Sequence, residues 1–457
     1  MFVHMYVIFR FGSTCYNLVL TSAVYIFMKI RNTIPKNHKY SKLIPFSMIE
    51  RKIYNQILHS IALRPVTLIT GARQVGKTTL CLKLRDEKGF RYVSLRDKSE
   101  RAMARNDPDL FLQLHPAPLI VDEVQYAPAL LESIESIVDR TKAESGNYKG
   151  MYVLTGSQAY KLMEGVSDSL AGRISVINMS PLSLSEILER EEIPFSIDMT
   201  RIAKRSQECS ISAPELFERI VRGMYPEPEV EKEMTTQEFY SDYVDTYIDR
   251  DVSEIINVHN KDKFHAFMQL VASLTGQELN YERIGSDVGI DGKTVKEWIS
   301  VLIAGDIIHL LQPYNDHSTA KRIVKRPKMY FWDTGLACYL SRVLDAESLE
   351  AGYLKGPMVE TFLVNEVLKT YRNAKLESPF YYYRDSNNAE IDLVMVKDGC
   401  VSLIECKSGT QFGWDDIKAV VRGIPTQYPI TGRGVLCLTE KPYPIQEGLY
   451  ALPVTSI

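Results

Sequence analysis

Several features that define other classes of protein are missing from this sequence. Its seven cysteines are scattered along 457 residues and none forms a C-x-x-C pair, so neither a zinc site nor a disulfide framework is indicated. A reducing, cytoplasmic location is therefore expected. The net charge of −3 gives the molecule no bulk attraction to nucleic acid, and any such binding would need a local basic patch. There is no internal repeat and no low-complexity tract.

The length and the N-terminus both bear on domain organisation. A chain of 457 residues is too long for one core, and about two to four domains are expected. Residues 11–29 are mostly apolar, which is typical of a membrane anchor or a signal sequence. The alternative is a start codon placed too far upstream, with Met48 as the true beginning. The segment has no A-x-A cleavage site, so we expect residues 1–47 to be a misassigned or disordered leader and no stable membrane association.

Short apolar runs alternate with helical stretches over residues 48–181. This alternation predicts a parallel sheet covered on both faces by helices. The expected strands are residues 65–70, 90–95, 118–123, 151–157 and 174–179.

The first of these strands leads into a glycine-rich loop of the form G-x-x-x-x-G-K-T. A loop of this kind between a buried strand and a helix is typical of phosphate binding, because successive backbone N–H groups and the helix N-terminus point at the phosphates. We expect Lys77 to neutralise phosphate oxygens and Thr78 to offer its hydroxyl to Mg²⁺. The predicted ATP-binding residues are Gly71, Ala72, Arg73, Gln74, Val75, Gly76, Lys77, Thr78 and Thr79.

Two further strand ends complete the predicted ATP·Mg²⁺ site. The run LIVDE places Asp122 to hold Mg²⁺ through water and Glu123 to activate the attacking water. The fourth strand ends near Thr155 and Ser157, either of which could orient that water; a turn-forming role is the alternative. Arg173, just before the fifth strand, is a candidate for reaching the ATP of a neighbouring subunit in a homo-oligomer, or for capping a helix.

The middle of the chain predicts helices and then a helix-turn-helix. Residues 182–260 have mostly helical spacing and are expected to form a lid and connector. Residues 280–305 predict two short helices, the second presenting Lys293 and Lys296 outward, followed by strands at 307–314 and 329–332. The loop between those strands is expected to be a basic wing for phosphate contact, although winged helices also pack against proteins. Its basic residues are Lys321, Arg322, Lys325, Arg326 and Lys328.

The C-terminal region carries a carboxylate pattern found in metal-dependent nucleases. Asp392 on one predicted strand and Glu405 on the next could hold Mg²⁺, and Lys407 could polarise a scissile phosphate. Glu360, on a predicted helix, could complete the site. A half-exposed strand also yields alternating Glu and Lys, so the pattern indicates a fold more firmly than an activity.

The order of these motifs resembles a group of prokaryotic AAA-type ATPases that carry a C-terminal domain of unknown function. The matching strings are TLITGARQVGKTTL, PLIVDEVQ, VLTGSQ, SLAGRI, GMYPE, YIDRDV, KMYFWDTGLACYL, EIDLV and LIECKSG. The resemblance implies an ATP-binding domain, a winged helix and a restriction-endonuclease-like tail.

The expected fold is therefore α/β with several modules. We expect a P-loop ATPase core at 48–181, a helical lid and connector at 182–260, a winged helix at 261–345 and a small α/β restriction-endonuclease-like domain at 346–457. One functional hypothesis is an ATPase coupled to a DNA-binding or nuclease-like module. The alternative is a nucleotide-dependent switch that binds a protein partner and keeps an inactive nuclease-like scaffold.

Overall fold

The computed structural model describes residues 9–11, 14–16, 48–156, 170–246, 261–315 and 326–457, and the chain divides into two units, Met1–Met48 and Ile49–Ile457. In the first unit β1 (Phe9–Phe11) pairs antiparallel with β2 (Thr14–Tyr16). Most of the predicted leader lies outside the described residues. Across the described part of the chain, we find no helix with the length and apolar character needed to cross a membrane.

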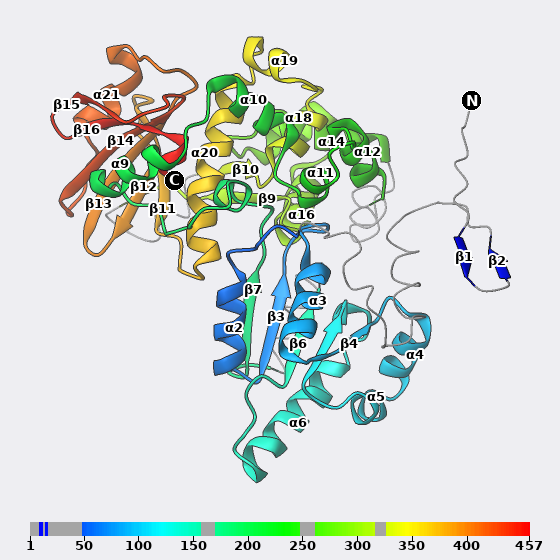
Figure 1. Ribbon diagram of the computed structural model, residues 1–457. Helices are drawn as coiled ribbons and strands as arrows, with labels where there is room; N and C mark the ends of the chain where they lie inside the picture. The colour runs from blue at the N-terminus through cyan, green and yellow to red at the C-terminus, as the bar shows by residue number, and fades with distance from the viewer. Residues whose placement is uncertain (1–8, 12–13, 17–47, 157–169, 247–260, 316–325) are drawn as a thin grey trace. The chain divides into compact units, whose positions relative to one another are not determined.

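A five-stranded parallel sheet opens the second unit (Figure 1). Its strand order is β4-β5-β6-β3-β7, and every neighbouring pair is parallel, which confirms the predicted parallel core. The three inner strands are buried along their whole length, as expected for strands covered on both faces. The strands are β3 (Val66–Thr70), β4 (Arg91–Ser94), β5 (Leu119–Asp122), β6 (Tyr152–Thr155) and β7 (Ile174–Asn178).

Helices cover both faces of this sheet because neighbouring strand residues point to opposite sides. Leu68 belongs to an apolar cluster with Leu130 and Ile134, whereas Ile69 belongs to a second cluster with Leu80 and Leu84. The helices of this region are α2 (Tyr54–Leu63), α3 (Lys77–Lys88), α4 (Lys98–Asn106), α5 (Pro108–Leu114) and α6 (Leu130–Glu144), with a 3₁₀ turn η1 (Val124–Tyr126).

A helical segment follows the sheet. Three of its helices begin with capping boxes, in which Ser183, Ser212 and Thr235 each exchange hydrogen bonds with a glutamate three residues later. Within the predicted lid and connector over 182–260, residues 247–260 lie outside the described part. The helices are α8 (Leu184–Ile187), α9 (Met199–Glu208), α10 (Ala213–Arg222), α11 (Pro226–Val230) and α12 (Thr236–Tyr243).

The middle region contains the two predicted short helices and two predicted strands. Gly289, at φ +74°, makes the turn between the helices. A two-residue strand, β8, joins the sheet in the order β8-β10-β9; two residues are too few for a sequence pattern to indicate. The elements are α14 (Lys261–Ser273), β8 (Gln277–Glu278), α15 (Tyr281–Val288), α16 (Gly292–Ala304), β9 (Ile308–Leu311) and β10 (Lys328–Phe331).

The C-terminal region is a six-stranded mixed sheet in the order β11-β12-β13-β14-β16-β15. β13 pairs parallel with β14, β14 pairs parallel with β16, and the other pairs are antiparallel. Asp398 and Gly399, both at positive φ, close the predicted hairpin between β12 and β13. The elements are α18 (Thr334–Leu340), α19 (Ala346–Ala351), α20 (Lys355–Asn373), β11 (Phe380–Arg384), β12 (Glu390–Lys397), β13 (Cys400–Cys406), α21 (Trp414–Arg422), β14 (Ile430–Cys437), β15 (Tyr443–Gln446) and β16 (Leu449–Pro453).

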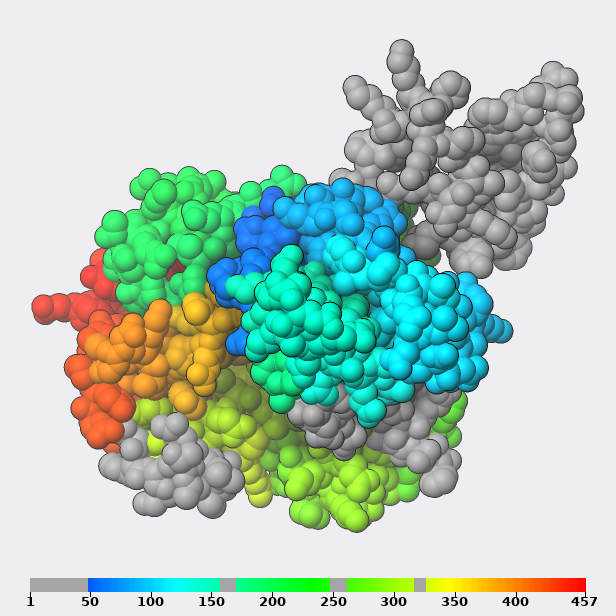
Figure 2. Space-filling view, turned by 90° about the horizontal axis from the view of Figure 1, so that it is seen from below, coloured from blue at the N-terminus to red at the C-terminus, as the bar shows by residue number. Residues whose placement is uncertain are grey.

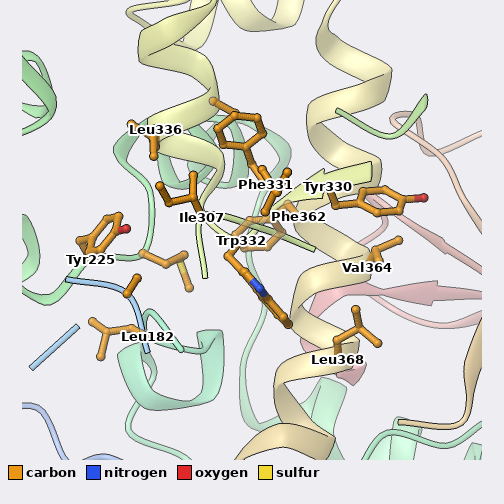
Figure 3. Close-up of a cluster of buried hydrophobic side chains, with 14 of the residues drawn as sticks. Leu182, Tyr225, Ile307, Tyr330, Phe331, Trp332, Leu336, Phe362, Val364 and Leu368 are labelled. Carbon is orange, nitrogen blue, oxygen red and sulfur yellow. The ribbon is translucent and has the colours of Figure 1, made fainter. Parts of the chain in front are cut away.

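The long helix α20 is buried on nearly all sides, as a helix that is packed by several layers must be. Figure 3 shows Phe362, Val364 and Leu368 along α20, with Trp332 between this helix and the segments that carry Leu182 and Tyr225. Hydrogen bonds also join α20 to the segment that leaves β7, and in Figure 2 the yellow-orange residues adjoin the blue-to-teal residues of the parallel sheet. α20 therefore contacts the first sheet, the middle region and the last sheet.

Candidate nucleotide-binding site

The glycine-rich loop connects the end of β3 to the first turn of α3. Gly71 and Gly76 have φ values of +134° and +94°, which residues with a Cβ atom rarely adopt. A Cβ added at Gly71 would lie 2.1 Å from the carbonyl oxygen of Met179, so only glycine fits against the exit of β7. The loop thus has the backbone curvature that a phosphate cradle requires.

Lys77 begins α3 and its ammonium is folded back onto the loop. Its Nζ donates to the carbonyl oxygens of Gly71 and Ala72, at 2.9 and 2.6 Å. Burial lowers the pKa of Lys77 to about 8, although the carboxylates of Glu123, Asp306 and Asp122 oppose that shift. Because the ammonium is desolvated and held by neutral carbonyls, phosphate oxygens would be far stronger partners for it.

Asp122 faces the helix that carries Thr78. The Thr78 hydroxyl lies 3.2 Å from Oδ2 of Asp122, while Tyr92 donates to the same oxygen at 2.9 Å and Thr155 donates to Oδ1. Hydroxyl and carboxylate oxygens are the ligands that Mg²⁺ prefers, so Thr78 and Asp122 fit the ion that the motif implies. Thr155 is occupied in orienting this carboxylate, which is a different task from the predicted contact with the lytic water.

The carboxylate of Glu123 is buried and held by donors that the sequence analysis did not select. Arg96 donates from Nε at 3.2 Å and from Nη2 to Oε1, and Gln125 donates to Oε2 at 2.5 Å. Burial alone would raise the pKa of Glu123, but hydrogen bonding and charge from Arg96 outweigh it and the pKa is lowered. Ser94 at the end of β4 pairs with Asp122 in the sheet, so residues just beyond β4 come near Glu123. A basic residue at that place was the only sequence signal for the contact with Arg96.

Arg51 is a second residue that no motif indicated. Its guanidinium donates to the carbonyl oxygen of Val75 in the loop at 2.5 Å and to that of Ser180 at 2.7 Å, and it pairs with Glu186 at 3.0 Å. It therefore fastens the glycine-rich loop to the segment that follows β7. A lone arginine ahead of an amphipathic helix carries no sequence signal for this role.

Two other predicted catalytic residues have different outcomes. Ser157 lies outside the described residues. Arg173 is held within its own chain by α6, donating to both carboxylate oxygens of Asp139 at 2.7 Å and pairing with Glu135 at 3.0 Å. Its side chain would have to leave these partners to reach another subunit.

The C-terminal candidates Glu360, Asp392, Glu405 and Lys407 are gathered in one place. Leu393 pairs with Ile404 across the β12–β13 hairpin, which sets Asp392 opposite Glu405, and Lys407 donates to Glu405 at 2.9 Å. Glu390, two residues before Asp392, joins the group. Among the described residues, no cluster of three or more His, Cys, Asp or Glu side chains has a geometry suited to a metal ion.

The predicted basic wing requires one correction. Lys328 is not a solvated wing residue but a buried residue of β10, with a side chain that is 3% exposed and paired with carboxylates of the C-terminal region. Its carboxylate partners are far apart in sequence, so residue spacing could not reveal them. Lys293, Lys296 and Arg326 are exposed, and Lys321, Arg322 and Lys325 lie outside the described residues.

The loop, the Thr78–Asp122 contact and Glu123 have the arrangement expected of a P-loop nucleotide site. Residues 63–188 match the family described as "AAA domain", and this chain carries an AAA-type P-loop ATPase domain. Residues 213–347 and 355–457 match two families described as domains of unknown function, DUF8612 and DUF4143.

Two relatives found by sequence are described as "Uncharacterized protein". One protein of Mycobacterium tuberculosis and one of Mycobacterium bovis are each 23% identical over 397 residues, covering 86% of this chain and 81% of the relative. Among solved structures, a Walker-type ATPase of Pyrococcus abyssi has a TM-score of 0.37 at 13% identity, covering 64% of this chain and 96% of that chain. DnaA of Aquifex aeolicus bound to AMPPCP has a TM-score of 0.25 at 16% identity, covering 55% and 85%. Scores this low do not define the fold or the function of the whole chain.

Proposed function

We propose that this protein hydrolyses ATP with Mg²⁺ and passes its nucleotide state to the C-terminal modules. The observation that carries the proposal is the 3.2 Å approach of the Thr78 hydroxyl to Asp122 directly beneath the glycine-rich loop, with Glu123 next to it. A P-loop strand end with these two carboxylates supplies one group for the ion and one for the water.

The residues of the chain have separate tasks in this reaction. Backbone N–H groups of the loop and the N-terminus of α3 bind the phosphates, and the Lys77 ammonium exchanges its two carbonyl partners for phosphate oxygens. Thr78 and Asp122 would hold Mg²⁺, which would supply positive charge to offset the charge that develops on the phosphate oxygens. Glu123 accepts a proton from the attacking water, at a lone pair that its side-chain donors Arg96 and Gln125 leave open.

The loss of Lys77 tests the site. Lys77→Ala should abolish phosphate release and weaken nucleotide binding, measured by a colorimetric phosphate assay and by titration with a fluorescent ATP analogue. Lys83→Ala, on the same helix and partly exposed, is the matched control and should leave both unchanged. Wild-type rates in Lys77→Ala would place hydrolysis elsewhere.

Three polar residues of α20 support coupling between the ATP site and the rest of the chain. Lys369 donates to the carbonyl oxygen of Leu182 at 2.8 Å, Glu366 accepts from the N–H of Leu184 at 2.6 Å, and Arg372 donates to the carbonyl oxygen of Asn178 at 3.1 Å. The side chain of Asn178 accepts from Thr70, the residue before the loop. A displacement of the loop by ATP would therefore reach α20 through two hydrogen-bonded steps.

A DNA-binding role for the middle region is the first candidate for the coupled activity. The proposal that 261–345 is a winged helix is supported by α15, α16 and the small sheet, with Lys293 and Lys296 exposed on α16. Replacing Lys321, Arg322, Lys325 and Arg326 with Ser should flatten the dependence of DNA affinity on salt, by about one unit of slope per lost phosphate contact. An unchanged slope would favour a protein partner for this region.

The nuclease-like tail distinguishes the two hypotheses. The buried Lys328 ammonium among the carboxylates favours the alternative, a nucleotide-dependent switch that binds a protein partner and carries an inactive nuclease-like scaffold. Purified protein should then leave linear and supercoiled DNA intact with Mg²⁺ or Mn²⁺, with and without ATP. Cleavage that disappears in Asp392→Ala would show an active nuclease.

A further inference from the structure

A cluster of carboxylates in the C-terminal region, from Glu360, Glu390 and Asp392, surrounds a buried cation. Lys328 Nζ lies 2.9 Å from Glu360 Oε1 and 3.2 Å from Asp392 Oδ1, and it also pairs with Glu390. The side chain of Lys328 is 3% exposed. One ammonium thus has three carboxylate partners and almost no contact with water.

The cation and its partners come from different parts of the fold. Lys328 begins β10, which pairs with β9 and β8 of the middle region, whereas Glu360 lies on α20 and both Glu390 and Asp392 lie on β12. Tyr330, two residues along β10, donates to Glu360 at 2.7 Å. The polar end of β10 therefore enters this cluster of carboxylates from outside the last sheet.

Several of the oxygens that a metal ion would need are already engaged. Asp392 accepts from Lys328 on Oδ1 and from the N–H of Cys406 on Oδ2 at 2.9 Å, and Glu360 Oε1 accepts from both Lys328 and Tyr330. Glu405 Oε1 accepts from Lys407, whereas Glu405 Oε2 is buried and has no hydrogen-bond partner among the described residues. A divalent cation at this place would lie against a buried ammonium, so the residues do not fit the metal that a nuclease-like site implies.

We propose that Lys328 is the resident cation of this site and takes the place that a divalent metal would occupy. The carboxylates of Glu360, Glu390, Asp392 and Glu405 are opposed by the ammonium groups of Lys328 and Lys407 and, at Glu390, by the guanidinium of Arg384. Removing the Lys328 ammonium leaves four carboxylates with one ammonium and one guanidinium at the edge. A neutral residue at position 328 would therefore convert this cluster of carboxylates into a Mg²⁺ or Mn²⁺ site, because these ions require oxygen ligands and uncompensated negative charge. This proposal rests on the candidate function in which the nuclease-like tail is an inactive scaffold, and it does not depend on ATP hydrolysis.

Manganese binding to the full chain, without nucleotide, tests this directly. Free Mn²⁺ would be followed by electron paramagnetic resonance in wild type, Lys328→Met and Lys328→Met/Asp392→Asn. We expect Lys328→Met to bind about one more ion per chain than wild type, and the double variant to lose that ion. Weak binding at Thr78 and Asp122 is common to all three proteins and cancels in the comparison.

A second neutral variant and the wild type keep the test decisive if Lys328→Met does not fold. Lys328→Gln retains a donor for one carboxylate and should also gain an ion, whereas Lys328→Arg retains the charge and should gain none. Wild type and Asp392→Asn should bind equal amounts of Mn²⁺. The proposal is overturned if wild type binds more Mn²⁺ than Asp392→Asn, or if a folded neutral variant binds no more than wild type. Neither result depends on whether the protein hydrolyses ATP.

Discussion

Arg96 and Gln125 determine the resting state of the proposed general base. Together they engage both oxygens of Glu123 and lower its pKa, which weakens it as a proton acceptor. Arg96→Ala should therefore raise the basal rate of ATP hydrolysis several-fold, measured as phosphate released per chain at saturating Mg²⁺·ATP. Arg91→Ala is the control, because Arg91 lies exposed on β4, the strand that precedes Arg96, and donates to the carbonyl oxygen of Pro116. A fall in rate would mean that Arg96 positions Glu123 for catalysis.

Glu192 predicts a pH dependence of stability. Burial raises its pKa from 4.5 to about 7, with Asn373 of α20 donating to its Oε1 at 2.8 Å. Because the folded pKa lies above the unfolded value, the favourable contribution is full below the unfolded pKa and is lost as pH rises through about 7. Glu192→Gln should remove this loss, so the urea midpoint of the variant should fall less than that of wild type between about pH 5 and pH 8. Parallel curves for the two proteins would contradict the assignment.

Residues inside a contiguous motif could be predicted, and residues that meet only through the fold could not. Asp122 and Glu123 follow an apolar run and Lys77 follows a glycine, so short-range spacing was enough to select them. Lys328 shows the opposite case, since its position within a basic run indicated a solvated wing while its carboxylate partners lie 32 or more residues away. Neutralisation by distant residues leaves no periodic trace in a sequence.

At the scale of elements, the buried pair on α20 should be sensitive to which partner is removed. Lys369 and Glu366 are 1% and 2% exposed and lie 2.8 Å apart. Lys369→Met leaves an unpaired buried carboxylate and should cost about 3–5 kcal/mol of stability, whereas Glu366→Gln/Lys369→Met should recover much of that loss. Thermal unfolding of the purified variants provides the measurement.

The matched control for this pair is Lys418 on α21. It pairs with Asp415 at the same i,i+3 spacing, but both side chains are exposed, so Lys418→Met should change stability by less than about 1 kcal/mol. If Lys369→Met were as mild as Lys418→Met, α20 would not be fastened by these charges to the segment that follows β7.

Elements built from long apolar patterns were the most predictable part of the fold. All five strands of the parallel sheet lie where the sequence indicated them, and the three inner strands had the clearest signal because strands covered on both faces are mostly apolar. β8 escaped prediction because two residues show no alternation. α20 was predicted as a helix, but its burial on all sides depends on three layers that are contributed by distant segments.

At the scale of the whole molecule, variants of Arg173 test whether neighbouring subunits share the active site. Mixing Arg173→Ala with Lys77→Ala protein should restore part of the ATPase activity if Arg173 acts across subunits, because each chain then supplies the group that the other lacks. Asp139→Asn is a useful companion, since it removes one of the two α6 carboxylates that hold Arg173 and should raise activity in an oligomer. Mixed oligomers without any rescue, across several mixing ratios, would assign Arg173 to its ion pairs with α6.

Glu123→Gln tests the central claim that Glu123 drives ATP hydrolysis at this P-loop. The amide keeps the shape and the hydrogen-bonding reach of the side chain but cannot accept the proton of the attacking water. The measurement is ATP bound and phosphate released by the same preparation of Glu123→Gln, beside wild type. We predict unchanged Mg²⁺·ATP binding with phosphate release reduced by about 10²-fold or more. Wild-type turnover in Glu123→Gln would contradict the proposal and assign the reaction to another base.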